Sequence, residues 1–84
     1  MIGVGIDVAK AKSMVAILSD DGEIIKAPFE IANTESGLSS LCKIIKELPD
    51  KVYCVVESTG VYHFPVVSYL QENDIFVSVV NPLI

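Results

Sequence analysis

The feature that most constrains this chain is the apolar stretch KVYCVVE, residues 51–57, which lies between two segments of helical periodicity. A run that stays apolar until its last residue predicts a central strand covered on both faces. The segment before it can be capped by Asn33 or Thr34 and is stopped by Pro49. Its apolar residues recur every three or four positions and are Leu38, Leu41, Cys42, Ile45 and Leu48.

The segment after this run predicts a second helix at about 62–72 and a last strand at 75–80. The expected inward stripe of this helix is Phe64, Val67 and Leu70. A helix that connects two side-by-side strands forces them to be parallel, with a right-handed crossover. The second half of the chain therefore predicts a parallel sheet.

The first half predicts an antiparallel meander of three strands, at residues 2–8, 13–19 and 23–31. The turn between the last two is SDDG, and Pro28 indicates that the third strand lies at a sheet edge, because proline donates no ladder hydrogen bond. We therefore expect an α/β fold with the order β-β-β-α-β-α-β and a mixed sheet of strand order 3-2-1-4-5. The simplest placement leaves the side beyond the fifth strand uncovered.

Composition limits the classes of function. The chain has 84 residues, 51% of them hydrophobic, and a net charge of −5, which opposes a basic nucleic-acid-binding face unless metal ions intervene between carboxylates and phosphates. No apolar run is long enough to span a bilayer, and no signal peptide is expected. Cys42 and Cys54 are interpreted as small buried residues in a reducing compartment. The expected location is the cytoplasm.

Two acids end apolar strands. Asp7 follows GVGI and Glu57 follows VYCVV. If the first and fourth strands are parallel neighbours, both carboxylates lie at the carboxyl edge of the sheet, where α/β proteins bind ligands. Paired carboxylates suit Mg²⁺ or Mn²⁺ and metal-dependent phosphodiester cleavage. The alternative is that each acid merely marks a strand end in solvent. Gly3 and Gly5 share the face of Asp7 and are expected to leave room for a covering helix.

Six further residues near these acids are candidate nucleic-acid contacts: Lys10, Lys12, Thr59, Gly60, Tyr62 and His63. Ser58 or Thr59 can cap the second helix, whose free N–H groups favour an anion. Tyr62 and His63 can stack on a base or contact a phosphate. Each has an ordinary alternative: a cap and turn, solvated lysines, and a surface histidine.

The sequence resembles the N-terminal domain of IS110-family transposases from Gly3 to Pro82. The motifs that carry the resemblance are GIDVAKAKSMVAIL, PFEIANTESGLSSL, VVESTGVYHFPVVSYL and VSVVNP. The resemblance implies a RuvC-like, ribonuclease H-type fold with a DEDD tetrad of acids that binds Mg²⁺, in which Asp7 matches the first acid and Glu57 the second. It also implies DNA and a structured guide RNA as partners.

The family's two remaining aspartates follow the segment that matches VNP. The resemblance therefore implies that residues 1–84 are a single, partial catalytic domain that lacks its C-terminal part and is inactive alone. A catalytic serine of the family lies in a further domain.

Two rival functions remain open at this stage. The opening hairpin also looks like that of sugar kinases and other actin-like ATPases, although the turn VAKAK has no glycine or threonine to hold phosphate on backbone amides. Alternatively, the chain is an interaction module without chemistry. In that case its exposed last strand can pair with another copy to form a homo-oligomer.

Overall fold

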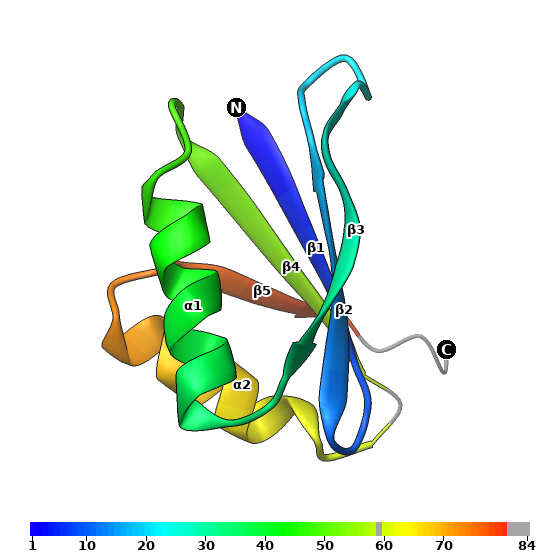
Figure 1. Ribbon diagram of the computed structural model, residues 1–84, viewed down its shortest axis with the longest axis vertical. Helices are drawn as coiled ribbons and strands as arrows, with labels where there is room; N and C mark the ends of the chain where they lie inside the picture. Colours follow the sequence, from blue (N-terminus) through cyan, green and yellow to red (C-terminus); the bar gives the residue numbers. More distant parts are fainter. Residues whose placement is uncertain (59, 81–84) are drawn as a thin grey trace.

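The computed structural model describes residues 1–58 and 60–80, which form one five-stranded sheet and two helices (Figure 1). The sheet has the order β3-β2-β1-β4-β5, and the elements follow one another as β-β-β-α-β-α-β. Both findings confirm the predicted fold class. The elements are β1 (Ile2–Val8), β2 (Lys12–Leu18), β3 (Ile24–Ala32), α1 (Glu35–Lys46), β4 (Val52–Ser58), α2 (His63–Glu72) and β5 (Val77–Val80).

The first three strands form the expected antiparallel meander. The turn between β2 and β3 is closed by a hydrogen bond from the Gly22 amide to the Ser19 carbonyl, and Gly22 has a φ of 82° that glycine adopts without strain. Pro28 lies in β3, which is an edge strand as predicted. Strands β2 and β3 begin and end within one residue of their predicted limits. β5, by contrast, begins two residues later than expected.

Helix α1 begins where the sequence predicts. The Thr34 hydroxyl accepts a hydrogen bond from the Gly37 amide at 3.2 Å, which satisfies one of the free donors of the first turn. Gly37 also lets the helix approach β3 closely, since a Cβ atom there would lie 2.9 Å from the carbonyl carbon of Ala32. The four buried residues of α1 all belong to the predicted apolar stripe: Leu38, Leu41, Cys42 and Ile45.

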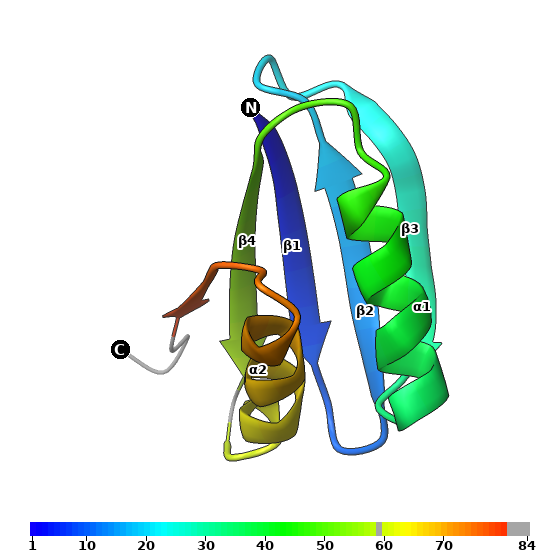
Figure 2. The ribbon, with the colours of Figure 1, turned by 90° about the vertical axis from the view of Figure 1, so that its left-hand side faces the viewer.

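Both helices lie on the same face of the sheet (Figure 2). The physical reason is the right-handed crossover: the chain moves in the same direction across the sheet from β3 to β4 and from β4 to β5, so both connections pass over one face. The buried residues of β1 and β4 point toward this face and pack under the helices.

The prediction that both faces of β4 are covered is wrong for the part of the chain that the structure describes. Burial alternates along β4, with Cys54 and Val56 buried and Tyr53 46% exposed. A Cβ atom added at Gly5 would meet no other atom within 4 Å. The glycines of β1 therefore do not face a covering helix among the described residues. We call the face of the sheet that carries Gly5, Asp7, Tyr53 and Glu57 the open face.

Helix α2 differs from its prediction in two respects. It begins at His63 after the N-cap residue Tyr62, whose side chain makes no capping hydrogen bond. Of the two predicted caps, Ser58 lies in β4, whereas Thr59 lies outside the described residues and stays a prediction. The buried positions are Val66 and Leu70, whereas Phe64 is 60% exposed. Because 3.6 residues make one turn, Phe64 lies about 200° around the helix from Val66 and faces away from the core.

Both cysteines are free and buried, as predicted. Burial raises the pKa of the Cys54 thiol to about 11, which keeps it neutral and unreactive at ordinary pH. None of the helices in the described residues is long and apolar enough to cross a membrane.

Candidate functional site

Asp7 and Glu57 face each other across two adjacent parallel strands. They are direct register partners in the pairing of β1 with β4, and both side chains are exposed. Neighbouring strands lie about 4.8 Å apart, and register partners point to the same face of a sheet. The two carboxylates therefore project together from the carboxyl ends of their strands onto the open face. The pairing on which the sequence prediction depended is confirmed.

The same register places a third acid in line with this pair. Asp7 pairs with Met14 of β2, and Met14 pairs with Glu30 of β3. Glu30 thus lies two strands from Asp7, on the open face. The sequence alone does not indicate this position of Glu30, because the alignment depends on an irregularity in the β2–β3 pairing between Val15 and Ile17.

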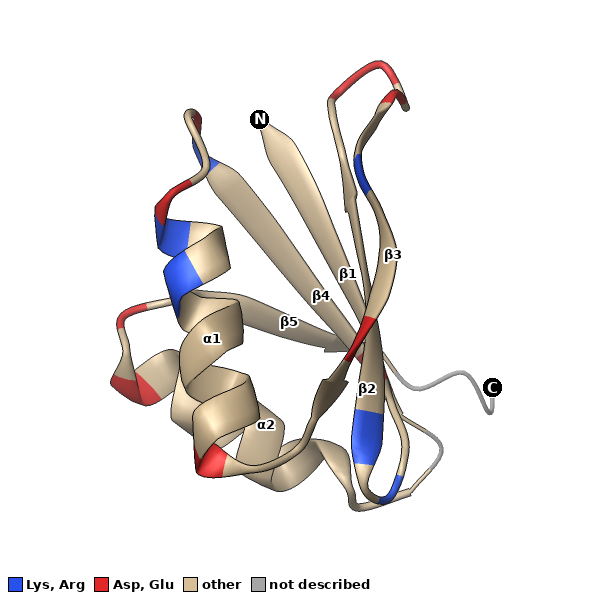
Figure 3. Ribbon diagram, viewed as in Figure 1, with Lys and Arg blue, Asp and Glu red and all other residues tan. Residues whose placement is uncertain are grey.

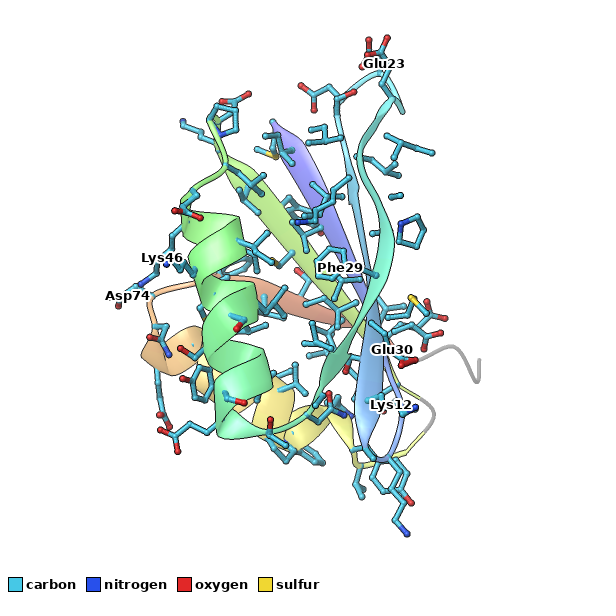
Figure 4. All side chains as sticks on the ribbon, in the orientation of Figure 1. Lys12, Glu23, Phe29, Glu30, Lys46 and Asp74 are labelled. Atoms are coloured by element: carbon cyan, nitrogen blue, oxygen red, sulfur yellow. The ribbon has the colours of Figure 1, made fainter. Side chains whose placement is uncertain are left out.

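Glu30 forms an ion pair with Lys12 of β2. Its Oε1 atom lies 3.5 Å from Nζ of Lys12, and both side chains are largely exposed (Figure 4). Figure 3 shows this mixture of charges, with the lysines of β2 and of the β1–β2 connection beside the acid of β3. Among the described residues, no group of three acids, histidines or cysteines is placed so that it could hold a metal ion.

Two shallow hollows meet at Asp7. One, of about 420 Å³, is lined by Asp7 together with Lys10, Lys12 and Glu30. The other, of about 250 Å³, is lined by Asp7, Glu57 and small or apolar residues of strands β1 to β4, which include Gly5. The structure thus brings both predicted lysines to the side of Asp7 that faces β2, and Glu57 to the other side.

The remaining predicted residues lie in the connection between β4 and α2. Figures 1 and 2 place this connection at the same end of the sheet as the β1–β2 connection. Gly60 is exposed, and Tyr62 is 45% exposed. His63 is half-buried, and within the described part of the chain its Nδ1 atom is buried without a hydrogen-bond partner. Its ring centroid lies 4.3 Å from that of Phe64, with the ring planes 32° apart.

The sequence pattern predicted that Phe64 belongs to the buried stripe of α2, but its side chain is exposed. The signal that could have found it is the phase of the helix. Val66 and Leu70 are four residues apart and define an inward face that excludes Phe64.

Solved structures share this fold at low sequence identity. RuvC of Thermus thermophilus has a TM-score of 0.68 and 12% identity, over 99% of this chain and 63% of the other. A ROK family glucokinase from Streptomyces griseus, in complex with glucose and AMPPNP, has a TM-score of 0.62 and 17% identity, over 96% of this chain and 33% of the other. Pelota of Archaeoglobus fulgidus has a TM-score of 0.63 and 16% identity, over 94% of this chain and 26% of the other.

These likenesses show the fold alone, since RuvC and a sugar kinase match it about equally well. The chain spans between about a quarter and two thirds of the length of these structures. No curated protein matches the sequence. The family model described as a transposase, that of the IS110 transposases with a DEDD motif, matches residues 4–84. Because this match covers nearly the whole sequence, the chain belongs to the IS110 family of DEDD transposases.

Proposed function

We propose that this domain carries part of the metal-dependent site with which a transposase performs phosphodiester chemistry on DNA. The observation that carries the proposal is the register of β1 and β4, which sets Asp7 and Glu57 side by side on the open face. Family membership supports the same function, because the two residues match the first two acids of the DEDD motif that the sequence resemblance implies.

The chemistry of the pair favours a divalent cation. Two carboxylates about 4.8 Å apart repel each other, and a bound cation removes that repulsion. Carboxylate oxygens are hard ligands that suit Mg²⁺ or Mn²⁺, and Mg²⁺ retains several waters when few carboxylates bind it. When bound, such an ion would supply activation of a nucleophile and stabilisation of the leaving oxygen in phosphodiester cleavage. Asp7 and Glu57 would supply two ligands.

The resemblance implies that the other two acids of the tetrad follow the segment matching VNP, so we propose that further residues of the protein complete the site. Residues 1–84 are then one part of a catalytic domain and are inactive by themselves. Chemistry on DNA agrees with the cytoplasmic location expected from the sequence.

The proposed DNA contacts follow, in the sequence, the two strands that carry the acid pair. Lys10 and Lys12 line the hollow next to Asp7, and their positive charge supports the proposal that they meet phosphate oxygens. Thr59, Gly60, Tyr62 and His63 follow β4, the strand that carries Glu57, in the sequence. With a net charge of −5, the chain depends on metal ions to bring phosphates near its carboxylates.

A guide RNA and a second copy of the chain are further proposed partners. The guide RNA is implied by the family. Pairing between copies is supported by the edge position of β5, in which Val79 and Val80 are exposed. Light scattering of the purified chain, with Val79→Lys as an edge-blocking variant, measures whether such pairing occurs. A wild-type chain that stays monomeric at high concentration would refute it.

The test of the metal site compares variants of the full-length protein. Asp7→Asn and Glu57→Gln are nearly isosteric and each removes one charge. We expect both to weaken Mn²⁺ or Mg²⁺ binding, measured by calorimetry, and to abolish recombination of a DNA substrate. Glu30→Gln is the matched control, because it removes an exposed strand carboxylate of the same face that binds Lys12. Metal binding and recombination that persist unchanged in both acid variants would overturn the proposal.

The glucokinase likeness makes an ATP-dependent kinase the second candidate. The β1–β2 connection, residues 9–11, has the sequence AKA and offers neither glycine nor hydroxyl to a phosphate. ATP hydrolysis that is lost in Asp7→Asn, without any DNA chemistry, would favour the kinase.

A further inference from the structure

An aromatic corner lies where β4 leads into α2. It consists of Tyr62, His63 and Phe64, of which Tyr62 is 45% and Phe64 60% exposed. The exposed rings sit at the start of a helix that buries Val66 and Leu70 against the sheet, so the backbone that carries them is fixed. Exposed aromatic rings on a rigid element are typical of a binding surface.

The ring of Phe64 is supported by its neighbour. The His63 ring is half-buried and lies 4.3 Å from the Phe64 ring, with the planes 32° apart. His63 thus supports one side of Phe64, while the rest of the phenyl group stays in solvent. A supported ring loses little side-chain freedom on binding, which favours stacking of a flat ligand on its free side.

The corner lies within reach of the acid pair. Tyr62 lies five positions after Glu57 in the sequence, so at most about 18 Å of extended chain joins them. That distance corresponds to about five nucleotides of a stacked strand. A strand whose phosphate lies at the acids can therefore reach the aromatic corner, around the carboxyl edge of the sheet, with a nucleotide at most about five positions away.

The aromatic corner has no cationic lysine or arginine to attract a phosphate, so it favours contact with a base. Residues 57–64 have the sequence ESTGVYHF, which contains no lysine or arginine and one acid. Bases inside a duplex are already stacked on both sides, so only an unpaired base can use an aromatic ring.

We propose that Tyr62 and Phe64 form a stacking platform for an unpaired nucleobase of the strand held at the acid pair. This inference rests on the proposed function for its substrate. It assigns Phe64 a role in binding. The acid pair engages the phosphate through a metal ion, and the platform holds a base next to it out of the duplex stack.

The test uses the full-length protein and oligonucleotides that carry 2-aminopurine, a base whose fluorescence is quenched by stacking. The probes are a single-stranded DNA, a single-stranded RNA and a DNA duplex, in buffer with Ca²⁺ in place of Mg²⁺, so that a cation still bridges the acids and the phosphate while cleavage is suppressed. We expect Tyr62→Ala and Phe64→Ala to restore the fluorescence and to weaken single-strand binding between about fivefold and 100-fold. Duplex binding should change by less than twofold.

Phe76→Ala is the matched control. Phe76 is 75% exposed and precedes β5, which is parallel to β4, so it lies at the opposite edge of the sheet from the acids. Phe64→Trp should retain the quenching, because indole also presents a flat face. Since Phe64 is mostly exposed, its truncation leaves the fold intact, which circular dichroism verifies.

The outcomes separate the platform from the metal site. If Tyr62→Ala and Phe64→Ala bind both single-stranded probes like Phe76→Ala, or weaken duplex binding equally, the platform is refuted. Quenching by the DNA probe alone assigns the base to the DNA strand, and quenching by the RNA probe alone assigns it to an RNA partner. Retained recombination in Asp7→Asn, with quenching lost in Phe64→Ala, refutes the metal site and leaves the platform standing.

Discussion

Replacing Asp7 by asparagine removes one of two like charges that face each other across β1 and β4, so we expect the metal-free chain to become more stable. Glu57→Gln should have the same effect, and the double variant should gain no more than either single variant. Most substitutions destabilise a protein, so a gain at both positions is a distinctive result.

The size of the gain follows from the strand spacing. Two unit charges about 4.8 Å apart in water repel by about 0.9 kcal/mol. The water value applies because both side chains are exposed, and it falls at the upper end of the roughly 0.2–1 kcal/mol observed for cross-strand pairs. For a domain of this size, the melting temperature should rise by between about 1 and 7 °C. In 1 M salt, where the screening length is about 3 Å, most of the gain should disappear.

The assay is a double-mutant cycle measured by urea and thermal unfolding in buffer with a chelator, at low and high salt. Glu30→Gln is the control of opposite sign, because Glu30 faces Lys12 at 3.5 Å and loses an attraction of up to about 1 kcal/mol. Additive effects of Asp7→Asn and Glu57→Gln, with no salt-dependent coupling between them, would show that the two carboxylates do not face each other.

Three further measurements test the packing and capping of α1 and the burial of Cys54. A change from glycine to alanine usually stabilises a helix by about 1 kcal/mol. Gly37→Ala should instead destabilise the chain by about 1–3 kcal/mol, because the new Cβ would meet the Ala32 backbone at 2.9 Å or less. A variant that is more stable in urea unfolding would contradict this contact. Thr34→Ala should lower stability by about 1 kcal/mol through loss of the cap, whereas Thr34→Ser should not. The Cys54 pKa of about 11 exceeds the unfolded value of 9.0, so the stability contributed by the neutral thiol is complete below pH 9 and is lost as the pH rises through 11. Thiol titration at pH 8 should therefore detect Cys54 only after unfolding, and its reaction in the native chain would contradict this.

The acid pair was predictable because it depends on local and topological rules. Alternation along β1 and the apolar run of β4 each ended in an acid, and the parallel crossover rule brought the two strand ends to one edge. The helix cap at Thr34 and the edge position of β3, with its Pro28, followed from chemistry within a few residues. Each of these predictions was confirmed.

The predictions that failed concerned which surfaces meet. An apolar strand such as β4 predicts burial on both faces, but the hand of two successive crossovers places both helices on one face. The phase of α2 was also misassigned, because a short helix with apolar residues on several sides fits more than one inward stripe.

The sequence by itself determined the order of elements, the parallel neighbours β1 and β4, and hence the pairing of Asp7 with Glu57, because periodicity, turns and crossover handedness are readable along the chain. Only the tertiary structure decided that the acids project from an open face, that Glu30 joins their row opposite Lys12, and that Phe64 is exposed. These facts depend on a register irregularity and on the rotation of a helix about its axis. Both are set by packing between segments that are distant in sequence.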